Sequence, residues 1–594
     1  MFTFNTFLRN FFRLFLLVFL VLNGPAFFSG CSGGGGGGGS SSSSAVVDPP
    51  PDPTPPDPTP PDPSTVAPVI DKTVATTVST STAFLYTGTN PIQTGVATDT
   101  IEAKRAAVIR GKVLDRNNTP LSDVNITILN HPEFGQTLSR DDGMFDMAIN
   151  GGAYLTVNYK KSGYLPVQRQ VDVPWQDFAH ASDIVMIAVE SEVTSIDLAA
   201  TEIEVARGSE VTDDDGTRRA TMLFTPGTTA EMVLPDGTTQ PLTTLNMRAT
   251  EYTVGENGPE AMPAELPPNT AYTYAVELSA DEALAAGATQ VNFNQPVYTY
   301  VENFIGAPLG TAVPTGYYDK EKGQWIASAN GRVIQVLDVA SGIATLDTDG
   351  DGTEDNASVL ALLNITDAER EKIASLYTAG QELWRVPIEH LSPYDCNWPY
   401  GPPEDAVVYN DSDPTTNNPE NNPCEGGGSI IECQNQILGE RINVVGTPYN
   451  LNYRSDRVTG RKSDYNVEIP LSGETLPDSL SVILLEIHIA GRVFNETFLT
   501  RPNQVYTFTW DGLDVYGREG VGRQPITVYI RYRYPAVYYA VESSFEDSFA
   551  RVQGSSATEG NIDENSFIAH EDSMQIDIQK VWRGFVGSEE NDST

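Results

Sequence analysis

The sequence is poor in positive charge and in cysteine. Its 594 residues hold 36 lysines and arginines against 79 aspartates and glutamates, which gives a formal net charge of −43 at pH 7. Nucleic-acid binding needs a basic surface that meets the phosphates, so this balance argues against nucleic acid as a partner. The same sign argues against electrostatic attraction to an acidic membrane surface. Four cysteines in a chain of this length do not make a disulfide scaffold.

Sequence motifs of catalysis are also missing. The sequence has no H-E-x-x-H zinc motif, no G-x-S-x-G elbow, no phosphate-binding loop and no G-x-G-x-x-G after a predicted strand. The abundant acids leave a carboxylate pair for glycoside hydrolysis open as an alternative. We expect a protein that is not an enzyme and has no catalytic residue. The five histidines are far apart in the sequence, and we expect His488 on the solvent face of a strand; they are His131, His180, His390, His488 and His570.

The residues that are plentiful indicate β structure. The chain contains 50 glycines, 41 prolines and 25 tyrosines, and 40% of its residues are hydrophobic. This composition is typical of many short strands joined by turns, with enough apolar surface for real cores. At about 150 residues per domain, we expect three or four domains in an all-β chain.

Residues 1–30 are predicted to be a targeting signal. Arg9 and Arg13 precede the apolar run 14–22, which is too short to span a bilayer. The sequence Phe28-Ser29-Gly30-Cys31 resembles a bacterial lipobox, in which the cysteine is lipidated and becomes the mature N-terminus. We expect an exported protein held in the outer membrane by lipid on Cys31, on the cell-surface or the periplasmic side. The alternative is an ordinary secretory peptide with Cys31 free.

Residues 31–68 are expected to be a tether. A glycine run (33–39) and a serine run (40–44) predict a flexible coil. Proline-rich repeats at 50–64 predict an extended polyproline stalk, with a docking site for a proline-reading domain as the alternative. We assign residues 69–100 to a connector of uncertain structure.

Residues 101–190 are expected to form one small β-sandwich. Val124, Ile126 and Ile128 alternate with Asn125 and Thr127, as in a strand with one buried face. Turn signals recur every 8–12 residues. Four motifs make the stretch similar to the transthyretin-related, carboxypeptidase-regulatory-like domain of teneurins and bacterial YD-repeat (Rhs-type) proteins: 130–135 (NHPEFG), 142–146 (DGMFD), 150–152 (NGG) and 174–175 (PW). The resemblance implies a non-catalytic accessory fold.

Residues 191–395 are expected to be β-rich, as one or two further sandwich domains. One helix is predicted, because Thr366 and Glu369 are spaced as a capping box before Ile373. The segment 347–355 (DTDGDGTED) matches a calcium loop, in which oxygens from one tight turn surround a hard cation. Ser358 replaces the usual last acid, so we expect a weak site, with an acidic surface turn as the alternative. The expected ligands are the side chains of Asp347, Asp349, Asp351 and Asp355 and the carbonyl of Thr353.

Residues 396–433 are expected to be a linker rich in asparagine and proline. With Cys31 lipidated, Cys396, Cys424 and Cys433 are left, and export permits one disulfide among them. We expect Cys396–Cys424, with Cys424–Cys433 as the alternative. The role of such a bridge would be structural.

Residues 434–594 are predicted to form a last β domain. A strand pattern is predicted near the end, in which Val528, Ile530, Tyr532 and Tyr534 alternate with Tyr529, Arg531 and Arg533. The segments 429–461 and 506–518 resemble the region just before the repeat shell of YD-repeat proteins, which implies an immunoglobulin-like plug domain. The expected fold is thus a string of immunoglobulin-like and transthyretin-like β-sandwiches after a signal and a stalk.

The function expected from these features is a lipid-anchored scaffold or plug region of a YD-repeat, teneurin-like protein. Tandem YD repeats are absent from the sequence itself. The expected partners are the membrane, through the N-terminal lipid, and a repeat shell or toxin cargo if one is encoded downstream. The alternative is a surface adhesin or carbohydrate-binding lipoprotein with a protein or glycan ligand. Calcium is the one cofactor expected.

Overall fold

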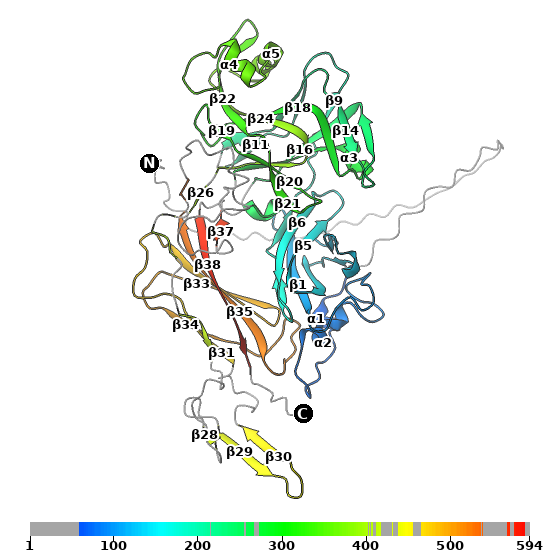
Figure 1. Cartoon of the computed structure of the whole chain (residues 1–594), viewed down its shortest axis with the longest axis vertical. Coiled ribbons are helices and arrows are strands. Elements are labelled where there is room, and N and C mark those ends of the chain that lie inside the picture. The colour runs from blue at the N-terminus through cyan, green and yellow to red at the C-terminus, as the bar shows by residue number, and fades with distance from the viewer. Residues whose placement is uncertain are drawn as a thin grey trace, which may run out of the picture. The chain divides into compact units, whose positions relative to one another are not determined.

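In the computed structural model every element described here belongs to the unit Thr59–Thr594 (Figure 1). Among the described residues, no helix is both long and apolar enough to cross a membrane. Cys31 and the lipobox lie outside the described residues. The structure describes residues 59–213, 216–254, 257–266, 273–398, 400–401, 403, 405–407, 412–416, 430–431, 438–454, 465–535, 537–538, 567–570 and 575–587.

Strands make up 47% of the described chain and helices 9%, as the composition predicts, and three sandwiches hold most of the strands. The N-terminal sandwich packs two four-stranded sheets around a core that includes Val124, Ile126 and Ile128, so the predicted alternation is confirmed. β1 pairs antiparallel with β4 and parallel with β7 and β8. One sheet holds β1 (Ala106–Asp115), β4 (Met144–Asn150), β7 (Phe178–His180) and β8 (Ile184–Met186). The other holds β2 (Asn125–Ile128), β3 (Thr137–Leu138), β5 (Ala153–Lys160) and β6 (Val167–Val173).

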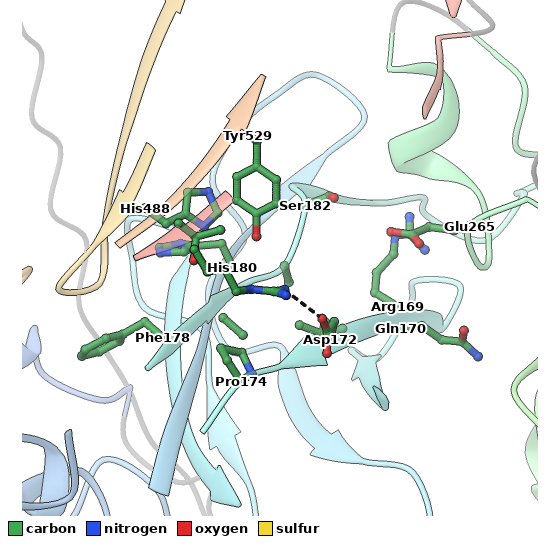
Figure 2. Close-up of a pocket in the computed structure, with 15 residues that line it drawn as sticks. Arg169, Gln170, Asp172, Pro174, Phe178, His180, Ser182, Glu265, His488 and Tyr529 are labelled. Carbon is green, nitrogen blue, oxygen red and sulfur yellow. Dashed lines mark hydrogen bonds and ion pairs between the residues drawn. The ribbon is translucent and has the colours of Figure 1, made fainter. Parts of the chain in front are cut away.

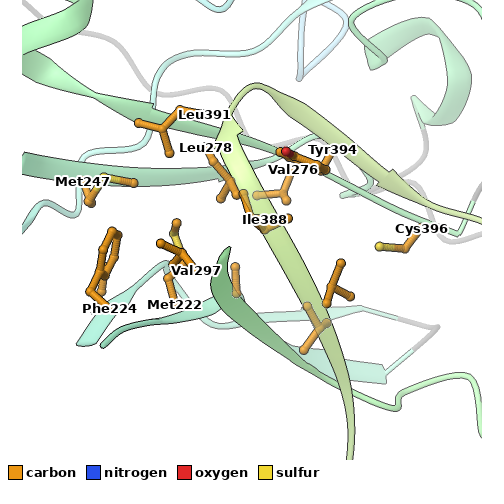
Figure 3. Packing of buried hydrophobic residues seen from close by; sticks show 14 of the residues in the cluster. Met222, Phe224, Met247, Val276, Leu278, Val297, Ile388, Leu391, Tyr394 and Cys396 are labelled. Carbon is orange, nitrogen blue, oxygen red and sulfur yellow. The ribbon is translucent and has the colours of Figure 1, made fainter. Parts of the chain in front are cut away.

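The middle sandwich has one shared core between a nine-stranded and a six-stranded sheet (Figure 3). Met222 and Val297 from the larger sheet face Val276 and Leu278 from the smaller one. The larger sheet holds β10 (Glu204–Arg207), β13 (Thr221–Phe224), β14 (Ala230–Val233), β15 (Thr239–Leu242), β18 (Gln290–Glu302), β19 (Ala312–Val313), β22 (Gly331–Ala340), β23 (Ile343–Asp347) and β24 (Glu382–Leu391). The smaller holds β9 (Thr194–Asp197), β16 (Thr244–Glu251), β17 (Tyr274–Ala280), β20 (Thr315–Asp319), β21 (Gln324–Ala327) and β25 (Pro393–Cys396). Beside them lie the hairpin β11 (Val211–Asp213) and β12 (Gly216–Arg218) and the helices η3 (Gly258–Ala261), α3 (Asp281–Ala286) and α4 (Ala357–Leu362).

The helix predicted in the middle region is present as α5 (Asp367–Leu376). The Thr366 side chain accepts a hydrogen bond from the Glu369 backbone N–H and so caps the helix. Ile373 is fully buried, and Glu369 forms a buried ion pair with Arg385 of β24 at 2.7 Å. The helix therefore covers the sheet through apolar contacts around Ile373 and one buried ion pair.

The C-terminal sandwich is built from a three-stranded and a five-stranded sheet. Val528, Ile530 and Tyr532 point into its core, as their alternation predicts. One sheet holds β27 (Thr415–Thr416), β31 (Asn466–Pro470) and β34 (Val505–Thr509), and the other holds β32 (Val482–Ile489), β33 (Arg492–Phe498), β35 (Gln524–Pro535), β37 (Phe567–His570) and β38 (Gln575–Val586). Two small sheets pair separately: β28 (Ile430–Ile431), β29 (Leu438–Asn443) and β30 (Asn450–Arg454) form one, and β26 (Tyr400–Gly401) with β36 (Val537–Tyr538) forms the other.

The N-terminal segment, residues 59–100, is more ordered than the expected stalk end and connector. Asp62 caps a one-turn helix that starts at Pro63, a residue whose fixed φ suits the first helical position. Further on, Gln93 is fully buried and donates hydrogen bonds to the carbonyls of Phe134 and Ala148. The segment is therefore part of the folded unit. Its elements are α1 (Pro63–Val66), α2 (Val78–Thr82) and η1 (Ala83–Leu85), and η2 (Pro132–Phe134) lies in the adjoining sandwich.

Candidate functional site

A buried ion-pair network lies where the N-terminal sandwich meets the C-terminal one. Arg110 of β1 and Arg140 both donate to Asp146 of β4, at 2.5 and 2.8 Å. The three residues are at most 7% exposed. A buried carboxylate flanked by two guanidinium groups is compensated, whereas any one of these charges alone would be costly.

The same network reaches into the C-terminal sandwich. Arg110 donates to the carbonyl oxygen of Gly491 at 2.7 Å, and the Tyr516 hydroxyl lies 3.3 Å from Asp146. Burial raises the pKa of Tyr516 well above its usual value, and the nearby Asp146 charge adds to that effect. Gly491 has a positive φ, and a Cβ there would come within 3.0 Å of the Phe178 ring. The two sandwiches therefore meet through close, specific contacts.

The N-terminal segment covers this meeting point. Phe84 packs edge-on against Tyr516 with ring centroids 5.3 Å apart, and Arg518 donates to the Ser81 carbonyl at 3.0 Å. The backbone N–H of Thr76 donates to the carbonyl of Val521, also at 3.0 Å. We call the contacts of Arg110, Asp146, Gly491, Tyr516 and this segment the three-part joint.

The motifs quoted for the family resemblance occupy tight structural positions. Gly135 has a positive φ, and a Cβ there would lie 2.0 Å from the carbonyl oxygen of Thr94. A Cβ on Gly152 would lie 1.8 Å from the indole nitrogen of Trp175, so the motifs at 150–152 and 174–175 pack on each other. Only glycine fits both places. These motifs thus serve the fold.

A cleft of about 150 Å³ opens between the N-terminal and C-terminal sandwiches (Figure 2). An ion pair between Asp172 of β6 and Arg583 of β38, 3.3 Å long, crosses it. Its polar lining includes Asp172, His180 and Ser182 from one sandwich and His488, Thr527, Tyr529 and Arg583 from the other.

Two of the five histidines meet in this cleft. The rings of His180 and His488 lie 4.5 Å apart, so His488 is covered by the other sandwich and the expectation that it faces solvent was wrong. Burial, reinforced by the charge of Arg110 and by His488, lowers the pKa of His180 to about 3. Burial alone would raise the pKa of Glu486, but hydrogen bonds and charge from His488 and Arg531 lower it to about 2. The spacing of residues in the sequence could not predict this cluster, because His180 and His488 come from strands that are far apart in the sequence.

The predicted calcium loop brings three of its expected ligands together. The carboxylates of Asp347, Asp349 and Asp351 offer oxygens that all lie within 4.8 Å of one another. Asp347 is fully buried and accepts N–H groups of Gly350 and Gly352 at 2.7 and 2.8 Å. These donors hold the turn in place, with Asp349 and Asp351 on its exposed side.

The remaining expected ligands of this loop are arranged differently. One carboxylate oxygen of Asp355 accepts both the N–H and the hydroxyl of Thr348, at 2.7 and 2.6 Å. Thr353 donates its N–H and its hydroxyl to Asp351. Ligation by Asp355 and by the Thr353 carbonyl stays a prediction. The residues whose arrangement suits a hard cation are Asp347, Asp349 and Asp351.

Cys396 has a free thiol, so the expected Cys396–Cys424 disulfide is not formed in the structure. Its side chain is buried in β25 near the Thr315 hydroxyl, and burial raises the pKa of the thiol to about 12. Its place inside a strand of the middle sandwich, rather than in a linker, explains the difference. Cys424 and Cys433 lie outside the described residues, and their pairing stays a prediction.

Comparison with known proteins bears on the N-terminal sandwich. Residues 101–186 match the family model described as the teneurin TTR-like domain. These residues form a TTR-like domain of the teneurin type. Teneurin-3 of Mus musculus is 43% identical over 94 residues, which are 16% of this chain and 4% of that protein. Teneurin-m of Drosophila melanogaster is 34% identical over 106 residues, 18% of this chain and 4% of that protein.

The chain spans about 4% of the length of the curated relatives it matches. Among solved structures, a 3-chlorocatechol 1,2-dioxygenase from Rhodococcus opacus is similar over 16% of this chain and 64% of its own, at 14% identity. The TM-score of that match is 0.14, too low to carry any argument.

Proposed function

We propose that this protein is a non-catalytic scaffold of the cell envelope. The observation that carries the proposal is the three-part joint, in which a buried ion-pair network of the TTR-like domain is hydrogen-bonded to Gly491 and Tyr516 of the C-terminal sandwich beneath the N-terminal segment. A scaffold must hold its modules in a fixed arrangement, and buried, mutually satisfied charges specify one arrangement. In this proposal the C-terminal sandwich is a plug-type domain that positions a YD-repeat shell or toxin cargo encoded downstream.

The anchoring part of the proposal is lipidation of Cys31 and tethering to the outer membrane through residues 31–58. It is tested by labelling the source cells with a palmitate analogue and blotting outer-membrane fractions with an antibody against residues 101–190. We expect a labelled band in the membrane fraction that disappears in Cys31→Ser. Equal membrane association of the two forms would refute the anchor.

The same blot tests the scaffold assignment. A band well above the 64.4 kDa of this chain would support an attached repeat shell. A band at the calculated mass, together with no co-purifying repeat protein, would contradict the scaffold and favour an independent adhesin.

A glycan-binding adhesin is the second candidate, and two exposed aromatic side chains favour it. Trp175 is 60% exposed and packs on the Gly152 turn. Tyr154 is 63% exposed and lies just after this turn in the sequence. Exposed, firmly held rings can stack on sugar rings. On a glycan array, loss of binding in Trp175→Ala but not in Tyr449→Ala, another exposed ring (73%) that is far from this turn in the sequence, would support the adhesin.

We also propose that the loop 347–355 binds calcium, supported by the three converging carboxylates. Calorimetry on the full chain tests this proposal with two variants. Asp349→Asn removes one carboxylate of the loop, and the control Asp338→Asn removes one exposed carboxylate outside it. We expect a calcium-binding heat at millimolar concentration that Asp349→Asn abolishes. Identical titrations of the two variants would rule the site out.

A further inference from the structure

Two histidines from different domains face each other in the cleft. His180 ends β7 of the TTR-like domain and His488 lies in β32 of the C-terminal sandwich, with ring planes inclined at 67° (Figure 2). A zinc-class ion binds imidazole nitrogen at about 2.0–2.1 Å, so two such nitrogens lie about 3–4 Å apart. Rings whose centroids are 4.5 Å apart reach that spacing by small rotations.

One nitrogen of this pair has no partner among the described residues. His180 Nε2 is buried and makes no hydrogen bond there. Leaving such a group unsatisfied is costly, and native structures rarely do so without a water or an ion in place. The nitrogen therefore points to something bound beside it.

The other histidine is oriented in the way that metal-binding histidines are. His488 Nε2 lies 2.6 Å from Glu486 Oε1, and the second carboxylate oxygen accepts from Arg531 at 2.9 Å. Metal-binding histidines commonly give their distal N–H to a carboxylate, which fixes the ring and its tautomer. With Nε2 as the donor, Nδ1 of His488 keeps its lone pair.

We propose that His180 Nε2 and His488 Nδ1 bind one divalent ion of the zinc class between the TTR-like domain and the C-terminal sandwich. Glu486 orients His488, and water completes the coordination. The positive charge of Arg110 opposes a cation at His180 and the carboxylate of Glu486 favours it. The two imidazole nitrogens of this site favour a zinc-class ion, whereas the carboxylate oxygens of the loop at 347–355 favour calcium. The proposal does not depend on the proposed function.

Zinc titration of the full chain tests the proposal, with calcium present to occupy the acidic loop. We expect the wild type to bind one more zinc ion than His180→Phe or His488→Ala. His180→Phe keeps a ring in place and removes the nitrogens. Glu486→Gln should keep the stoichiometry and weaken binding about 10- to 100-fold.

The matched control is His131→Phe. His131 also lies against a carboxylate, 2.9 Å from Glu133, but within the described part of the chain no second histidine ring lies beside it. Its zinc stoichiometry should equal that of the wild type. Cobalt provides a second readout, since a visible absorption band should appear in the wild type and be lost in His180→Phe.

Equal zinc stoichiometry in the wild type and His180→Phe would overturn the proposal. An unchanged zinc affinity in Glu486→Gln would overturn it as well. This second test remains available if a histidine variant fails to fold. Zinc should also raise the unfolding midpoint of the wild type more than that of His180→Phe, because the ion links two domains.

Discussion

Single glycines in the TTR-like domain show what the family motifs do. Gly135→Ala places a methyl group 2.0 Å from the Thr94 carbonyl in a left-handed backbone, whereas Gly163→Ala has the same backbone problem with nothing within 4 Å. We expect Gly163→Ala to cost about 1–2 kcal/mol and Gly135→Ala clearly more. Urea unfolding of both variants measures the difference, and equal losses would mean that the close contact is unimportant.

Asp395 gives a pH-dependent prediction at one residue. It is fully buried, Asn397 donates to one oxygen, and the other oxygen has no hydrogen-bond partner among the described residues. Burial raises its pKa well above the ordinary 3.8, so the folded state holds the proton and the unfolded state releases it. Stability should therefore fall as pH rises from about 4 through the raised pKa.

Asp395→Asn should remove this pH dependence, because the amide stays neutral and can still accept from Asn397. We expect the variant to gain stability over the wild type in urea unfolding at pH 8, with a smaller gain at pH 5. A gain that is the same at both pH values would show that Asp395 does not titrate in this range.

At the level of strands, β1 and β4 depend on the charge between them. Asp146→Ala would leave Arg110 and Arg140 buried without their carboxylate, which we expect to cost about 3–5 kcal/mol. Asp142→Ala removes an acid 3.6 Å from Arg140 whose side chain is 57% exposed, and should cost below about 1 kcal/mol. Thermal unfolding of the two variants checks the ranking, which a loss in Asp142→Ala as large as that in Asp146→Ala would contradict.

Strands were also where the sequence was most informative. Alternation identified the strand around Ile126 and the inner face of β35, and a capping pattern identified α5, because each signal lies within a few residues. The joint gave no such signal. Asp146 and Tyr516 are 370 residues apart, and neither histidine of the cleft is near the other in sequence. Periodicity carries no information about pairings of that kind.

For the molecule as a whole, Tyr516 is the residue on which the joint converges. It contacts Phe84 of the N-terminal segment, Phe178 and Asp146 of the TTR-like domain, and Arg110. Tyr516→Ala should cost about 3–5 kcal/mol and separate the unfolding of the TTR-like domain from that of the C-terminal sandwich. Tyr516→Phe keeps the ring and should cost about 1 kcal/mol without splitting the transition.

Differential scanning calorimetry distinguishes these outcomes. One transition in the wild type and in Tyr516→Phe, with two in Tyr516→Ala, is the expected result. Two transitions in the wild type would show that the domains already unfold separately and that the joint contributes little cooperativity.

The N-terminal segment also dictates an order of folding. Its contact between Thr76 and Val521 joins residues 445 positions apart, so the surface on which it rests is synthesised long after the segment itself. Closing so long a loop is slow and is rewarded only once both ends are structured. The segment must therefore wait for a partner that is made much later, and its docking should be a late and slow phase of folding, which marks that both sandwiches are in place.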